Sequence, residues 1–253
     1  MENKKSNIDV YCLCWNEAKI IPFVIQYWKR FARHVYVYDN GSDDGSIELL
    51  SQYPDWITVR HFESNGEFDE LTQVYVRNNC WKGSDADWVV VCDMDECLYA
   101  KDIFGEIKKL EEKGVTMVAP QWCDVWSMEF PVYDENRLCH EIMGGVLLGN
   151  ETFLHKCLLF KPSQIQETNF GPGSHFCSPS GFVIKEILDK DIYIVHLKNL
   201  GVEYKIERYK QLNKRNSIIN KKCGLCTHYS MTEDKIREEF NEYTSKEKKM
   251  LRR

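Results

Sequence analysis

The first 92 residues alternate between short apolar runs and longer segments whose apolar residues recur at helical spacing. The apolar runs predict strands, because a strand that is buried on both faces reads as a continuous apolar stretch. The expected strands cover residues 8–14, 34–38, 57–62 and 87–92, and the expected helices cover residues 20–31, 46–52 and 68–81. Strands separated by helices need crossover connections, so we expect an α/β fold with a mostly parallel central sheet flanked by helices.

The second half of the chain is less regular. Its pattern predicts a helix over residues 103–113, strands over 116–120 and 191–196, and C-terminal helices over 202–219 and 232–250. Residues 121–180 are rich in aromatic residues, glycine and proline, and only two short strands, at 152–160 and 174–177, are expected there. Irregular loops on a rigid scaffold often provide specificity. No internal repeat divides the chain, so residues 1–253 are expected to form a single domain.

Composition excludes several classes of protein. The formal charge of −6 argues against nucleic acid as a partner, because such proteins normally carry a basic stripe. No apolar stretch approaches the roughly 18 residues of a membrane span, and residues 1–7 are polar with no secretory apolar region after them. We therefore expect a cytoplasmic protein without a transmembrane segment. The basic residues 246–253 are interpreted as a solvated tail, and peripheral contact with an anionic membrane stays open.

Eleven scattered cysteines do not form the dense framework of a small secreted domain. Most are expected to be buried free thiols in a reducing compartment. Cys223, Cys226 and His228 have the spacing of half a zinc site. No second Cys-x-x-Cys completes it, so zinc is not expected.

Three carboxylates follow the strand at 87–92 directly. Asp93, Asp95 and Glu96 end an apolar run, and ligands of parallel sheets collect at the carboxyl ends of the strands. Side chains alternate along an extended segment, so we expect Asp93 and Asp95 to share one cation while Glu96 and Met94 point elsewhere. Mg²⁺ or Mn²⁺ bound in this way completes its shell with water and substrate phosphates. The sequence therefore predicts a divalent metal site and a substrate that carries a diphosphate.

Asp39 stands at the end of a neighbouring strand. A carboxylate there can accept hydrogen bonds from a pyrimidine ring N–H or a ribose hydroxyl, although Asp and Asn also close turns that have no function. No Gly-x-x-x-x-Gly-Lys-Ser/Thr and no Gly-x-Gly-x-x-Gly follows any strand, which excludes the P-loop and the dinucleotide fingerprint. Because neither phosphate-binding loop is present, we expect a metal to neutralise the charge of the diphosphate.

Three segments in the first 100 residues resemble those of GT-A fold glycosyltransferases, in the family 2-like group with an Asp-x-Asp-Glu signature. The segments are Cys14-Trp15-Asn16-Glu17, Tyr38-Asp39-Asn40-Gly41-Ser42-Asp43-Asp44-Gly45-Ser46 and Asp87-Trp88-Val89-Val90-Val91-Cys92-Asp93-Met94-Asp95-Glu96. Each is weak alone, but their order is the one that this family shows. The resemblance implies a Rossmann-like GT-A domain with a nucleotide-sugar-binding half (1–100), an acceptor-side half (101–220) and a C-terminal helical tail (221–253).

The resemblance also implies roles for individual residues. Asp39 is expected to contact the nucleobase, and Asp95 is the better metal ligand of the acidic pair. The implied nucleotide-binding residues are Asn16, Glu17, Asp39, Arg77 and Asp93, and the implied ligands of Mn²⁺ or Mg²⁺ are Asp93, Asp95 and His196. Arg77 otherwise reads as an exposed helix charge, and His196 otherwise reads as a structural histidine.

The catalytic base stays open. Transfer with inversion needs a carboxylate or imidazole that takes the proton of the acceptor hydroxyl. The family's Glu-Asp pair is missing from the region around residues 171–176, so the sequence departs from the pattern here. The candidates are Asp124, Glu129, Glu141 and His175.

Three functions fit these features. The first is a metal-dependent glycosyltransferase that moves a sugar from a nucleoside diphosphate donor, UDP-linked in our interpretation, to a glycan or lipid-linked acceptor in surface polysaccharide or glycoconjugate synthesis. The second is a nucleotidyltransferase, which would use the same paired acids but release pyrophosphate. The third is a catalytically silent protein that binds carbohydrate through its aromatic-rich half.

Overall fold

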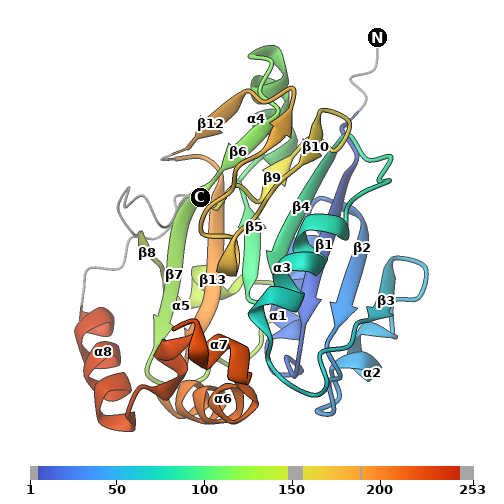
Figure 1. The fold of residues 1–253 in the computed structure, drawn as a ribbon. Coiled ribbons are helices and arrows are strands. Elements are labelled where there is room, and N and C mark those ends of the chain that lie inside the picture. Colours follow the sequence, from blue (N-terminus) through green and yellow to red (C-terminus); the bar gives the residue numbers. More distant parts are fainter. Residues whose placement is uncertain (1–4, 148–155, 189, 246–253) are drawn as a thin grey trace.

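The computed structural model of the chain describes residues 5–147, 156–188 and 190–245 (Figure 1). Within these ranges no helix is both long and apolar enough to cross a membrane. Two sheets stand side by side and carry helices on their faces (Figure 1). The predicted α/β class with a mostly parallel central sheet is confirmed. The predicted tail at 246–253 lies outside the described residues.

The larger sheet has seven strands in the order β12-β6-β9-β4-β1-β2-β3. Every neighbouring pair in it is parallel except the two pairs that include β9. The strands are β1 (Ile8–Cys14), β2 (Ala32–Asp39), β3 (Ile57–His61), β4 (Trp88–Asp93), β6 (Met117–Ala119), β9 (Leu159–Phe160) and β12 (Lys185–Ile187). The four strands predicted in the first 92 residues are therefore confirmed, within one or two residues at their ends.

The centre of this sheet explains the apolar runs. All seven residues of β1 are buried, as are the first five of β4, because helices cover both faces. The parallel register places Cys14 opposite Asp39 and Leu13 opposite Asp93. The carboxyl ends of β2, β1 and β4 thus meet at one edge of the sheet.

The smaller sheet has four strands in the order β5-β13-β7-β8: β5 (Glu96–Tyr99), β13 (Tyr193–Leu200), β7 (Gln121–Ser127) and β8 (Val146–Leu147). The sequence pattern predicted part of β13 and none of the other three. The expectation that residues 121–180 are largely irregular was wrong at its start, because β7 is long and its last six residues are buried. β7 pairs with β13, which is distant in the sequence, so an alternation of apolar and polar residues within β7 is not required and the strand cannot be recognised from its local pattern. A separate two-stranded sheet joins β10 (Ile165–Glu167) to β11 (Ser180–Gly181).

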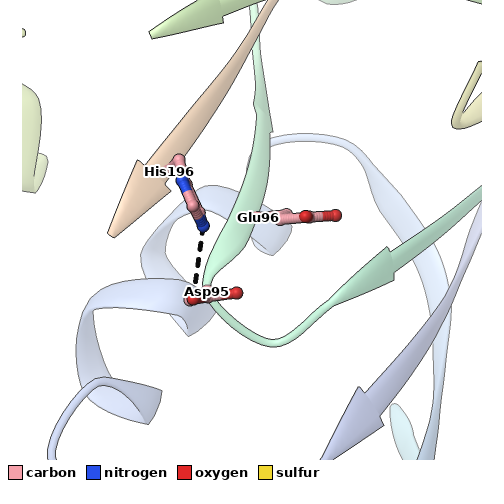
Figure 2. A group of neighbouring side chains, drawn as sticks. All are labelled: Asp95, Glu96 and His196. Atoms are coloured by element: carbon pink, nitrogen blue, oxygen red, sulfur yellow. Dashed lines mark ion pairs between the residues drawn. The ribbon is translucent and has the colours of Figure 1, made fainter. Parts of the chain in front are cut away.

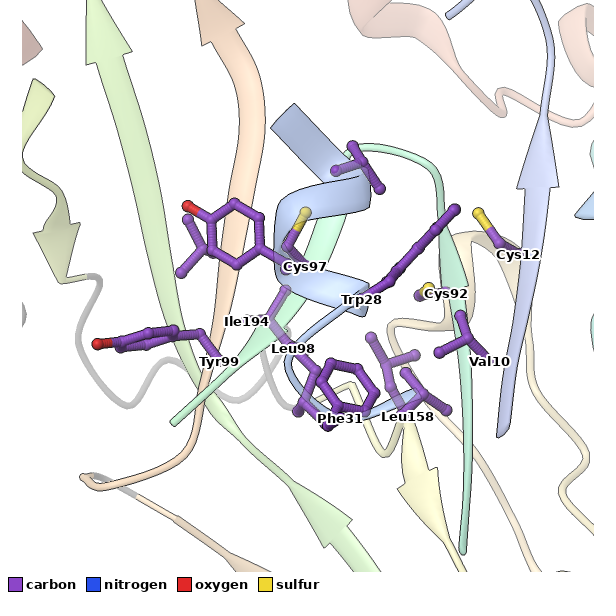
Figure 3. Close-up of a cluster of buried hydrophobic side chains, with 14 of the residues drawn as sticks. Val10, Cys12, Trp28, Phe31, Cys92, Cys97, Leu98, Tyr99, Leu158 and Ile194 are labelled. Carbon is purple, nitrogen blue, oxygen red and sulfur yellow. The ribbon is translucent and has the colours of Figure 1, made fainter. Parts of the chain in front are cut away.

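The helices that cover the sheets are α1 (Ile21–Trp28), α2 (Ser46–Leu50), α3 (Glu70–Asn79), α4 (Ile103–Glu112), α5 (Cys139–Met143), α6 (Val202–Arg215), α7 (Ile218–Lys222) and α8 (Glu233–Ser245), with the 3₁₀ turns η2 (Pro172–Ser174) and η3 (Thr227–Ser230). α1 is buried along most of its length, and Trp28 packs in one cluster with Cys97, Leu98 and Ile194 of the smaller sheet (Figure 3). This continuous core fixes the two sheets against each other.

Two further expectations were wrong. Residues 174–177 do not form a strand, because Pro172 starts a 3₁₀ turn there and Gly173 and Ser174 have positive φ. The helix predicted over 202–219 ends at Arg215, and α7 restarts after Ser217, whose hydroxyl accepts the Asn220 N–H as an N-cap. None of the eleven cysteines, which all lie in the described residues, forms a disulfide, and eight of them are buried, as expected.

Candidate active site

The acidic motif lies where the chain passes from one sheet to the other. β4 ends at Asp93, Met94 and Asp95 form the turn, and Glu96 begins β5. The antiparallel register of β5 and β13 places Glu96 opposite His196, and the parallel register of β13 and β7 places His196 opposite Asp124. Three strands that are far apart in the sequence therefore deliver their acids and an imidazole to one point.

Asp95, Glu96 and His196 form a cluster in which one ligand atom of each lies within 4.8 Å of the others (Figure 2). The Nε2 atom of His196 is 3.4 Å from Oδ2 of Asp95. Its Nδ1 atom is 2.8 Å from Oδ1 of Asp124, and a carboxylate in that position orients the ring of a metal-binding histidine. The structure thus groups Glu96 and His196 with Asp95, whereas the alternation argument had paired Asp95 with Asp93 and turned Glu96 away.

The electrostatics of this cluster favour a cation. Burial alone lowers the pKa of His196, but Asp95 and Asp124 outweigh it and raise the pKa to about 9. Burial likewise opposes ionisation of Asp95, yet the imidazolium of His196 and the nearby Lys198 and Lys156 hold its pKa below the usual range. Two carboxylates and an imidazole are a donor set that suits Mn²⁺, and such a cation would replace the proton on His196.

Asp93 is held by Arg77 rather than by this cluster. The guanidinium donates from Nη2 to Oδ1 of Asp93 at 2.7 Å and from Nη1 to Oε1 of Glu70 at 3.0 Å. Arg77 is buried, so the alternative interpretation of an exposed helix charge is wrong. Burial raises the pKa of Asp93, but Arg77 and Lys156 more than offset this and keep the carboxylate ionised.

Lys156 forms a buried ion pair with Glu96 and lies 5.2 Å from the ring centroid of Trp122. Burial raises the pKa of Glu96 in spite of this lysine. The sequence pattern missed Lys156, because no spacing in the sequence links it to the acidic motif. Only the tertiary structure shows that it belongs to the site.

A cavity of about 410 Å³ opens over this cluster. Its far wall comes from the loop after β1 and from α6. Arg208 of α6 donates to the carbonyl oxygens of Trp15 (2.7 Å) and Asn16 (3.2 Å) and pairs with Glu17. Burial raises the pKa of Glu17 to about 8, although Arg208 lowers it. The guanidinium carbons of Arg208 and Arg215 lie 4.9 and 4.0 Å from the ring centroid of Trp15.

Of the predicted nucleotide-binding residues, Glu17, Arg77 and Asp93 line the cavity. Asp39 lies beside it and accepts hydrogen bonds from the Gly41 N–H (2.9 Å) and the Ser42 hydroxyl (2.5 Å), which shape the loop after β2. Asn16 has a positive φ, and its side chain exchanges two hydrogen bonds with Asp43. These two residues therefore build the loops at the rim.

The four candidate bases lie in different places. His175 lines the cavity. Asp124 is behind the cluster, where it accepts from Trp122 Nε1 at 2.8 Å and contacts His196. Glu129 is exposed after β7, and Glu141 accepts from the Leu138 N–H at 2.9 Å at the start of α5. The structure brings one of the four, His175, to the cavity surface.

Several lining residues received no role from the sequence. Lys198 follows His196 by two positions on β13, so the alternation of a strand could have placed it on the same side. Tyr204, Lys205, Arg208 and Tyr209 have the spacing of one helical face, but nothing in the sequence showed that this face of α6 turns to the acidic motif.

Residues 10–193 match the family model of glycosyl transferase family 2. The chain belongs to this family. This membership confirms the resemblance seen in the three N-terminal segments. No curated protein matches the sequence.

Among solved structures, this chain is similar to S. aureus TarS 1-349, with 12% identity and a TM-score of 0.49 over 81% of this chain and 63% of that chain. The same TarS segment in complex with UDP-GlcNAc gives 11% identity and a TM-score of 0.49 over 94% and 71% of the two chains. GalNAc-T7 with UDP, GalNAc and Mn²⁺ gives 10% identity and a TM-score of 0.37 over 49% and 24%. The chain thus spans less than two thirds of the length of the first of these structures.

Proposed function

We propose that the chain transfers a sugar from a nucleoside diphosphate donor, UDP-linked, to a glycan or lipid-linked acceptor, and that Mn²⁺ or Mg²⁺ bound by Asp95, Glu96 and His196 assists the transfer. The observation that carries the proposal is the two-carboxylate and imidazole cluster at the floor of a cavity that cations also line, in a chain of glycosyl transferase family 2. When bound, the cation offsets the charge that develops on the leaving diphosphate.

The residues of the chain prepare this site. Asp124 fixes the ring of His196 so that Nε2 faces Asp95. Arg77 holds Asp93, whose side chain stays partly exposed to the cavity and can accept a hydrogen bond from a ribose hydroxyl. Lys198 adds positive charge next to Asp95, where the diphosphate would lie.

The other end of the cavity would hold the nucleobase. Trp15 lines the cavity, and the guanidinium groups of Arg208 and Arg215 pack over its ring. The contact between Asp39 and the base is part of the proposal, with Asn16 and Glu17 shaping the same rim. A pyrimidine fits this arrangement because Asp39 can accept a hydrogen bond from a ring N–H.

We assign the proton transfer to His175. Its imidazole lines the cavity, so a neutral ring can take the proton of the acceptor hydroxyl while the sugar–phosphate bond breaks and the diphosphate leaves. Replacing His175 with Asn should lower kcat by about 10²- to 10⁴-fold and leave donor affinity unchanged. Loss of donor binding together with kcat would contradict this role.

The metal and donor are tested together by thermal unfolding in the presence of nucleoside diphosphates. With Mn²⁺ and UDP at about 100 times the dissociation constant, binding adds about 2.7 kcal/mol to stability, and a chelator should abolish the shift. Asp95→Ala should also abolish it, whereas Asp55→Ala, at an exposed aspartate away from the cavity, should keep it. A UDP shift that survives in Asp95→Ala would refute the metal site.

The proposed location is the cytoplasm. Eleven cysteines without a disulfide among them, most of them buried, fit a reducing compartment. Product analysis completes the test of the reaction, since release of free nucleoside diphosphate supports sugar transfer and release of pyrophosphate would support nucleotidyl transfer.

A further inference from the structure

One surface of the molecule combines exposed isoleucines with basic charge. α7 exposes Ile218 (62%) and Ile219 (49%), and its last two residues are the exposed lysines Lys221 and Lys222. Residues spaced by three or four positions share one side of a helix, so Ile218 lies beside both lysines and Ile219 lies beside Lys222. We call these four residues the α7 face.

The charge of this region differs from that of the chain as a whole. Residues 211–232 contain the basic residues Lys214, Arg215, Lys221 and Lys222 and no acidic residue, although the chain carries a formal charge of −6. A local excess of positive charge on an acidic protein attracts an anionic surface. The α7 face joins this charge to apolar side chains, which is the combination that binds an anionic bilayer.

The α7 face is held rigidly in position. Asn220, on the buried side of α7, accepts the Glu70 N–H at 3.1 Å and donates to the carbonyl oxygen of Phe68 at 2.8 Å. The N–H of Ser217 also donates to that carbonyl oxygen, at 3.1 Å. α7 therefore sits against the start of α3, and its isoleucines are exposed because the polar side of the short helix is the side that is anchored.

The α7 face is next to the cavity. Leu212 before α7 and Gly224, Leu225 and Cys226 after it line the cavity, as do Phe68 and Glu70, which anchor the helix. On α3, Leu71 and Tyr75 follow one helical turn apart and are also exposed. A bilayer in contact with α7 would thus lie beside the cavity that binds the acceptor.

We propose that the α7 face docks this enzyme on a membrane that contains anionic phospholipids. The isoleucines enter the boundary between head groups and acyl chains, and the lysines pair with the phosphates of the lipids. The inference rests on the proposed function in one respect, because it places the acceptor on a lipid that the membrane presents. It needs neither the metal nor the donor for binding.

The test is sedimentation of the full chain with vesicles. Phosphatidylcholine mixed with phosphatidylglycerol should bind the protein, and phosphatidylcholine alone should not. Lys221→Gln combined with Lys222→Gln should weaken binding about 30-fold, since each lysine near the surface contributes about 1 kcal/mol. Ile218→Ser combined with Ile219→Ser should weaken it by at least about tenfold.

Matched pairs on the far side provide controls. Lys101 is exposed just before α4 and Lys108 is exposed within it. Ile184 is exposed just before β12 and Ile187 is exposed at its end. Both elements lie at the opposite end of the molecule from α7 (Figure 1). The same substitutions there should leave vesicle binding unchanged. The proposal is overturned if the native chain does not bind the anionic vesicles, or if the control pairs weaken binding as much as the α7 pairs.

A third result would also overturn it. If only the lysine substitutions weaken binding, the chain is attracted to the charged surface of the vesicle and the isoleucines do not enter the boundary between head groups and acyl chains. Binding of nucleoside diphosphate in solution, measured on the same variants, separates the two proposals. Nucleotide binding should persist in the α7 variants that have lost vesicle binding. A native chain that binds vesicles but no nucleotide would refute the proposed function and leave the membrane proposal standing.

Discussion

Replacing Arg77 with Met should destabilise the fold more than replacing an exposed charged residue would. The guanidinium is 4% exposed and holds Glu70, which is 5% exposed, together with Asp93, which is 30% exposed. It also donates to Oε1 of Gln73 at 2.9 Å. Methionine fills part of the space but leaves the Glu70 carboxylate buried, with the Gly173 N–H and the more distant Cys226 thiol as donors to it.

The magnitude follows from the burial of each partner. Removing one member of a buried ion pair costs about 3–5 kcal/mol, because an uncompensated charge stays inside. Asp93 is nearly a third exposed, so water screens its share and Glu70 dominates. We expect a loss of about 3 kcal/mol, which for a chain of this size lowers Tm by about 6–12 °C.

Urea unfolding at neutral pH, followed by circular dichroism, measures this loss. Lys82→Met is the matched control, because Lys82 pairs with Glu167 at 2.7 Å, as Arg77 does with Asp93, but both side chains are more than a third exposed. It should cost less than about 1 kcal/mol. Adding Glu70→Gln to Arg77→Met should restore part of the stability. If Arg77→Met is as mild as the control, or if the double variant is the least stable, the reasoning from burial fails.

Three further predictions test other parts of the structure. Burial lowers the pKa of His140 to about 4, so the unfolded chain binds a proton at this residue more readily than the folded chain does. The contribution of the neutral imidazole to stability is complete above pH 6.5 and should fall by about 3 kcal/mol between pH 6.5 and 4. His140→Gln should flatten this slope when melting is followed as a function of pH. Gly201→Ala should cost clearly more than Gly45→Ala in urea unfolding, since both have positive φ but only at Gly201 would a Cβ lie 2.7 Å from a backbone atom, the nitrogen of Phe130; equal costs would show that the contact is relieved. Asp124→Asn should weaken Mn²⁺ affinity by about 10- to 100-fold in titration calorimetry because His196 loses its orienting partner, and unchanged affinity would contradict that coupling.

The sequence by itself determined the strands and helices of the first 92 residues. β1 and β4 are buried on both faces, so each appears in the sequence as a continuous apolar run that can be recognised without knowledge of its partners. β1 pairs in parallel with both β2 and β4, so the residues at the carboxyl ends of these strands must meet at one edge of the sheet, which is why Asp39 and Asp93 could be placed there from their positions alone. The family signature lies in the same segments.

Only the tertiary structure decided which side chains meet at the centre of the site. The pairing of β5 with β13 sets Glu96 against His196, and it depends on a register between strands about 100 residues apart that no local pattern encodes. Lys156 reaches Glu96 from a position outside any helix or strand, and Arg77 is buried because α3 packs against β1 and η2. The local pattern of apolar residues shows how each segment is buried. The partners of a charged side chain depend instead on long-range packing, and this packing determines which acids and bases meet at the site.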